Sequence, residues 1–156
     1  MLTFTLDGER CGLPVEHVRE VVRAALPGRL PKAPPIVEGV LNVRGELVPL
    51  VDLRGRFGFA RRPLAPDDHV VIARVLDRTI AFGVDQVQDV IEASTEDAGS
   101  AGEIVAGIEH VAGVLRLPDG LLVIYDLRAF LSADELLGLG RALAEASPTL
   151  VEASTA

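Results

Sequence analysis

The sequence predicts a mainly β fold with two five-stranded β-barrels, a few short helices and a C-terminal helix. Three observations predict it: a module of roughly 70 residues occurs twice, each copy holds short apolar segments bounded by turn residues, and the core is aliphatic. Hydrophobic residues make up 49% of the chain but aromatic residues only 4%, which suits packed strands. Because a few short strands do not form a stable open sheet, each copy is expected to close into a small barrel.

The repeat is visible in two sets of matching segments. Residues 12–23 align without a gap with residues 81–92, with valine opposite valine or isoleucine and acidic residues opposite acidic ones. The landmarks that match further along, in the same order, are Gly39-Val40-Leu41 with Gly113-Val114-Leu115 and Asp52-Leu53-Arg54 with Asp126-Leu127-Arg128.

The elements of each copy follow from these turn signals and from the apolar alternation. Each copy begins with a strand pair, continues with a helical turn and a third strand, and ends with a hairpin. The expected strands of the first copy are residues 2–6, 10–13, 18–22, 40–44 and 46–51. Those of the second copy include residues 70–75, 79–83, 111–117 and 121–125, with Pro118-Asp119-Gly120 as the last turn.

The boundaries follow from composition. We expect one domain over residues 1–147, with the first barrel mainly in residues 14–66, the second mainly in residues 67–131 and some exchange of strands at the termini. Ser132 and Glu135 have capping-box spacing and predict a helix through about Ala146, which Pro148 is expected to stop. Residues 148–156 are then a flexible tail, and residues 94–103 form an acidic loop of unknown role.

The charge pattern and the motif content argue against several function classes. The net charge of −8 argues against a nucleic-acid partner, because such binding depends on neutralising phosphates. The three histidines are scattered, the single Cys11 is expected as a small buried hydrophobe, and phosphate loops and nucleophile motifs are missing, so no metal or cofactor is expected. The basic group of Arg54, Arg56, Arg61 and Arg62 is either a solvated turn or a surface that docks an acidic protein patch.

One enzymatic alternative comes from the repeat itself. Asp52 and Asp126 occupy equivalent places, as the paired carboxylates of a duplicated acid hydrolase would. Each of them follows a strand and precedes a short amphipathic segment, which is the place of a helix N-cap that accepts backbone N–H groups. The capping role is favoured over catalysis.

A set of ordered motifs places the chain in a known family. They are Pro31-x-Ala33-Pro34, Val37-x-Gly39-Val40-Leu41-Asn42-Val43-Arg44-Gly45, Val48-Pro49-Leu50-Val51-Asp52-Leu53-Arg54 and Phe57-Gly58. This order resembles the signature of CheW-like domains, the coupling proteins of bacterial chemosensory arrays. The resemblance covers residues 2–132 and implies two pseudo-symmetric, five-stranded SH3-like β-barrels.

The same resemblance implies a function without catalysis. The chain would be an adaptor that couples the cytoplasmic tip of methyl-accepting chemoreceptors to the regulatory domain of a CheA-type histidine kinase and modulates that kinase. It would be cytoplasmic and recruited to membrane-associated receptor arrays, with no direct membrane insertion. A receiver-less regulatory domain of another chemosensory pathway, for pili or development, is the alternative.

The resemblance also implies the partner-binding residues. Glu20 and Arg44 carry over as an ion pair near the contact surface, with Glu20 on the exposed side of a strand and orienting the arginine. Asn42 and Gly45 belong to the same turn motif as Arg44. The remaining positions are Gly39, Val18 and Val21, which carry over as apolar or close-approach positions, with plain core packing as an equal alternative for the two valines.

Overall fold

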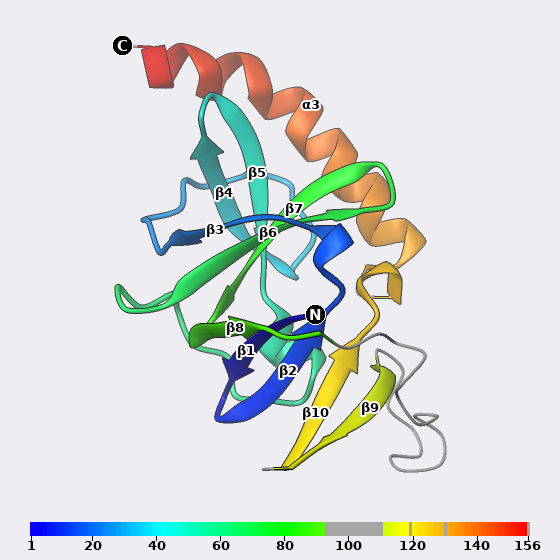
Figure 1. The fold of residues 1–156 in the computed structure, drawn as a ribbon. Helices are drawn as coiled ribbons and strands as arrows, with labels where there is room; N and C mark the ends of the chain where they lie inside the picture. The colour runs from blue at the N-terminus through cyan, green and yellow to red at the C-terminus, as the bar shows by residue number, and fades with distance from the viewer. Residues whose placement is uncertain (93–110, 119, 130, 156) are drawn as a thin grey trace.

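The computed structural model describes residues 1–92, 111–118, 120–129 and 131–155, and it contains two five-stranded sheets (Figure 1). The predicted acidic loop at residues 94–103 lies outside the described residues. The strands of the first copy are β1 (Leu2–Leu6), β2 (Glu9–Leu13), β3 (Val18–Arg23), β4 (Val37–Val43) and β5 (Glu46–Val51). Those of the second copy are β6 (His69–Val75), β7 (Arg78–Val84), β8 (Gln86–Val90), β9 (Val111–Leu117) and β10 (Gly120–Tyr125).

Each sheet takes strands from both copies of the repeat. The first sheet has the order β3-β6-β7-β5-β4, and the second sheet has the order β8-β1-β2-β10-β9. Replacing every strand by its counterpart in the other copy turns one order into the other, which is the pseudo-symmetry that the predicted fold class requires.

This exchange corrects the expected distribution of strands. Strands β6 and β7, expected in the second barrel, pair with β3 and β5 in the first sheet, while β1 and β2 join the second sheet. The physical reason is the parallel pairing of β5 with β7 and of β10 with β2. Parallel neighbours cannot be joined by a tight hairpin, so each of these strands must come from a distant part of the chain.

The core falls into three apolar clusters that follow this arrangement. The largest contains buried residues of both sheets, among them Phe4 of β1 and Phe82 of β7, whose ring centroids lie 6.1 Å apart. A second cluster belongs to the first sheet and its neighbouring segments, and a third belongs to the second sheet. The fully buried Cys11 is part of the largest cluster, as expected, and burial raises the pKa of its thiol to about 12.

The short helices are η1 (Val15–His17), α1 (Leu53–Arg56) and η3 (Leu127–Ala129), and the long helix α3 (Ala133–Thr155) runs along the first sheet (Figure 1). It buries Leu139 and Ala142 in the largest cluster. The predicted capping box is present, because Glu135 N–H donates to Ser132 Oγ at 3.1 Å and Ser132 N–H donates to Glu135 Oε1 at 2.9 Å. None of the described helices is long and apolar enough to cross a membrane.

The predicted end of this helix was wrong. The backbone stays helical past Pro148 to Thr155, where a flexible tail was expected. A proline inside a helix removes a single N–H···O=C bond and crowds the preceding turn, at a cost of about 3 kcal/mol. That cost is opposed by the alanine-rich sequence before it, since alanine has the highest intrinsic helix propensity.

Candidate functional site

The expected partner-binding residues centre on the turn between β4 and β5. Val43 pairs with Glu46, so Arg44 and Gly45 form a two-residue hairpin turn with φ angles of +52° and +86°. Gly45 N–H donates to Asn42 Oδ1 at 2.8 Å, which holds the turn in shape. The turn displays the Arg44 side chain, which is 78% exposed.

Glu20 anchors this arginine from the opposite edge of the first sheet. Arg44 Nη1 donates to Glu20 Oε2 at 3.2 Å, and a neighbouring pair joins Arg19 Nη1 to Glu46 Oε2 at 2.5 Å. Since β3 and β4 are the two edge strands of this sheet, the Glu20 pair links the edges that come together as the sheet curls. The Glu20 side chain is only 18% exposed, so its expected place on an open strand face needs correction: it is a half-buried anchor.

The other expected positions differ in their surroundings. Val18 is partly buried against the largest apolar cluster, whereas Val21 is 37% exposed. Gly39 lies where β4 is approached by the segment at Pro27 and Gly28, and a Cβ on it would stand 2.4 Å from the Gly28 carbonyl oxygen. Val18 therefore has a packing role and Gly39 a close-approach role, while the Val21 side chain is open to solvent.

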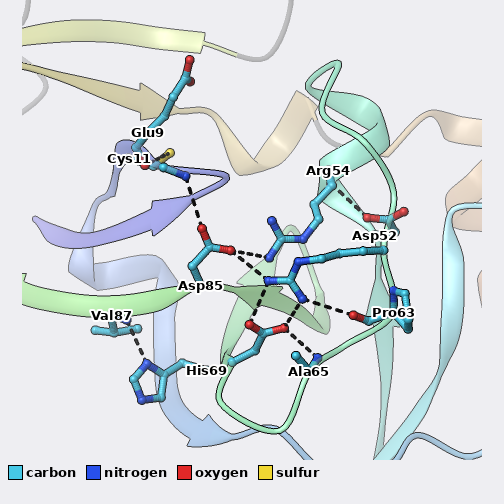
Figure 2. A network of polar contacts seen from close by, with 12 residues as sticks. Glu9, Cys11, Asp52, Arg54, Pro63, Ala65, His69, Asp85 and Val87 are labelled. Atoms are coloured by element: carbon cyan, nitrogen blue, oxygen red, sulfur yellow. Dashed lines mark hydrogen bonds and ion pairs between the residues drawn. The ribbon is translucent and has the colours of Figure 1, made fainter.

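A second cluster of charges, not foreseen from the sequence, surrounds Asp85 between β7 and β8 (Figure 2). Its carboxylate accepts hydrogen bonds from Arg54 Nη2 at 2.7 Å, from Arg62 Nη2 at 3.1 Å and from Gly8 N–H at 3.3 Å. Arg62 also makes a two-pronged contact with Asp68, at 2.7 and 2.9 Å. The sequence repeat aligns Asp85 with Glu16. That alignment shows an acidic residue in each copy but does not indicate the arginine contacts of Asp85.

These contacts account for the basic group of the sequence. Arg54 is 7% exposed and pairs with Asp85, Arg62 pairs with Asp68, and Arg61 Nε donates to Asp52 Oδ2 at 2.6 Å. Arg56 pairs with Glu135 at the start of α3. The four arginines of the basic group are thus paired within the chain, with Arg54 buried and Arg61 still 58% exposed.

The pairing is reflected in the titration of the carboxylates. Partial burial raises the pKa of Asp85, but the hydrogen bonds from Arg54 and from Gly8 N–H outweigh it and hold that pKa below its ordinary value. Asp68 behaves in the same way, with burial opposed by Arg62 and by Ala65 N–H, so its pKa is also lowered. Both carboxylates are therefore charged at neutral pH.

The aspartates of the hydrolase alternative act as caps. Asp52 Oδ1 accepts from Arg54 N–H at 3.0 Å at the start of α1, while its other oxygen accepts from Arg61. Asp126 Oδ1 accepts from Arg128 N–H at 3.0 Å at the start of η3. In the described part of the chain, no group of three or more His, Cys, Asp or Glu could hold a metal ion.

Comparison with known proteins agrees with this geometry. A family model described as the CheW-like domain matches residues 1–135. Chemotaxis protein CheW of Treponema pallidum is 32% identical over 87% of this chain and 84% of its own length. Protein FrzA of Myxococcus xanthus is 31% identical over 89% of this chain and 72% of its own.

A solved structure of a related protein has the same fold. The crystal structure of the scaffolding protein TtCheW from Thermoanaerobacter tengcongensis superposes with a TM-score of 0.76 at 27% identity, covering 86% of this chain and 92% of that one. The two-sheet, SH3-like fold is therefore shared with a scaffolding protein, and the chain is not an enzyme. By sequence and by structure, it belongs to the CheW-like domain family.

Proposed function

We propose that this chain is a non-catalytic adaptor that couples the cytoplasmic tip of methyl-accepting chemoreceptors to the regulatory domain of a CheA-type histidine kinase. It acts at receptor arrays by binding both partners on one body, so that the state of the receptor shifts the populations of active and inactive kinase. Membership of a family that includes chemotaxis scaffold proteins supports this role.

One observation carries the assignment of Arg44 to the contact surface. Arg44 has a φ of +52°, a left-handed conformation that costs a residue with a Cβ about 1–2 kcal/mol. Its exposed ion pair with Glu20 returns only about 0–1 kcal/mol. An arginine at such a turn, where asparagine or glycine is preferred, is better explained by what its side chain binds than by the stability of the fold.

The neighbouring positions complete the proposed contact surface. Glu20 orients the guanidinium, Asn42 and Gly45 fix the turn, and Val21 supplies an exposed apolar contact. Gly39 and Val18 support the surface from behind, through the close approach of the chain and through packing. Such a small patch suits an interface of modest affinity, which many copies in an array strengthen by multivalency.

Arg44→Asn tests the proposal, because asparagine tolerates the left-handed turn while removing the charge and the reach of arginine. The variant should fold with a melting temperature at or above that of the wild type. It should lose receptor-dependent activation of the kinase in a reconstituted phosphorylation assay, and it should retain less receptor or kinase in a pull-down.

Lys32→Asn is a matched control, because Lys32 also has a positive φ of +63° and a side chain that is 77% exposed. It should leave coupling unchanged. Full coupling by Arg44→Asn would remove Arg44 from the site, and an equal loss in both variants would show that net charge, not this surface, is responsible.

A second candidate is the same adaptor role in a chemosensory pathway for pili or development. The similarity to Protein FrzA, which is not named for chemotaxis, favours keeping it. Pull-downs with the histidine kinases encoded beside this gene would separate the two, since the kinase that is retained identifies the pathway.

A further inference from the structure

Asp85 stands at the point where the chain crosses from one sheet to the other. It is the single residue between β7, which belongs to the first sheet, and β8, which belongs to the second. Its backbone N–H donates to the Thr5 carbonyl of β1 at 2.9 Å. The crossover is therefore already attached to the second sheet by its main chain.

The side chain of Asp85 extends that attachment to the other sheet. One carboxylate oxygen accepts from Gly8 N–H in the turn between β1 and β2, on the second sheet. The other oxygen accepts from Arg54 in α1 and from Arg62, which lie in the segment between β5 and β6 of the first sheet (Figure 2). A single carboxylate thus holds segments of both sheets.

Among the residues that the structure describes, the equivalent crossover of the first copy lacks this arrangement. It runs from β2 to β3 through η1, and Glu16, the residue that the repeat aligns with Asp85, is exposed. A contact required by the repeated fold itself would be expected at both crossovers. The Asp85 contact is present at one of them, which indicates a specific role for this position.

We propose that Asp85, with Arg54, Arg62 and Gly8, forms a clasp that fixes the orientation of the two sheets relative to each other. This role does not depend on which partners the chain binds. Arg62 is in turn fixed by Asp68, whose side-chain hydrogen bonds stay within the segment before β6 and do not reach the second sheet. Asp68 therefore offers a comparison that disturbs the same arginine without cutting the link between sheets.

Asp85→Asn is the decisive variant, because the amide cannot accept on both sides at once. If its oxygen faces the arginines, its NH₂ group faces the Gly8 N–H; if its oxygen faces Gly8, the NH₂ group faces the arginines. Either orientation sets donor against donor on one side of the clasp. The side chain keeps its size, so the change is confined to hydrogen bonding and charge.

The experiment measures the distance between spin labels on the two sheets by pulsed electron paramagnetic resonance. Labels on cysteines introduced at Arg74 in β6 and Arg116 in β9 occupy exposed positions, and the native Cys11 is fully buried. We expect a distance distribution that is wider in Asp85→Asn than in the wild type. Asp68→Asn should keep the width of the wild type, even if it lowers the melting temperature.

An unchanged distribution in Asp85→Asn would overturn the clasp, and so would an equal widening in Asp85→Asn and Asp68→Asn, which would point to general loosening. If Asp85→Asn does not fold, Arg62→Gln replaces it. Arg62→Gln removes the ion pair between Arg62 and Asp68, which Asp68→Asn also removes. In addition, it removes the bond from Arg62 to Asp85. It should widen the distribution beyond that of Asp68→Asn, and equal widths in these two would overturn the clasp.

Discussion

A single methyl group at Gly39 should destabilise the chain, because β4 is approached there by another segment. Gly28 and Val40 exchange two backbone hydrogen bonds of 2.8 Å each, and a Cβ on Gly39 would lie 2.4 Å from the Gly28 oxygen. That contact forces the segment at Gly28 away from β4 and breaks both bonds. At about 0.5–1.5 kcal/mol net for each bond, Gly39→Ala should cost about 2 kcal/mol.

Thermal and urea unfolding followed by circular dichroism measure this loss. A cost of about 2 kcal/mol corresponds to a fall of roughly 4–8 °C in melting temperature for a chain of this size. The urea m-value should not change, since Gly39→Ala and the wild type expose nearly the same surface on unfolding.

Gly28→Ala is the control from the other side of the same bridge. Its Cβ would meet Val40 at an ordinary 3.6 Å, so this variant should stay within about 1 kcal/mol of the wild type, with a gain possible from the stiffer unfolded chain. Equal stability of the two alanine variants would refute the close approach at Gly39. A large loss in Gly28→Ala alone would show that the steric conflict arises at Gly28 and not at Gly39.

Two further predictions concern the carboxylates that pair with the basic group. The lowered pKa values of Asp85 and Asp68 stabilise the fold above the unfolded value of about 3.9, so this contribution is lost as pH falls through the folded values. Urea titrations between about pH 5 and pH 3 should therefore show a smaller loss of unfolding free energy in Asp85→Asn than in the wild type; equal losses would contradict the assignment. Asp52→Ala should lower the stability by about 1 kcal/mol through the lost cap of α1. In thermal unfolding, Asp52→Asn should lose less stability, because the asparagine oxygen still accepts from Arg54 N–H. Equal losses in the two variants would show that Asp52 does not stabilise the chain as a cap.

The repeat could be predicted from the sequence, but the partners of its strands could not. Matching landmarks show that two segments have the same structure, and five strands are found in the described residues of each copy. They do not show which strands are adjacent in space. The neighbours of β2 and β7 are fixed by parallel pairing with β10 and β5, and such contacts between distant residues have no local signal.

The candidate site was predicted unevenly for a related reason. The Arg44-Gly45 turn has a local signature, since a short polar turn between apolar strands indicates a hairpin. The partner of an arginine has no such signature. Arg54, Arg56, Arg61 and Arg62 form one basic group by their closeness in sequence, yet the partner of Arg54 is Asp85, which lies 31 residues away.

Burial then separates two kinds of arginine in the first sheet and the segment that follows it. Arg54 is 7% exposed and its charge is satisfied by Asp85. Breaking this pair would leave the buried guanidinium without its carboxylate, which is strongly unfavourable. Arg44 is 78% exposed and its pair with Glu20 is weak, so a partner bound at the proposed contact surface would replace that pair at little cost. The chain therefore has ion pairs in two settings: the pair of the buried Arg54 belongs to the proposed clasp between the sheets, and the exposed pair presents the Arg44 guanidinium at the proposed contact surface.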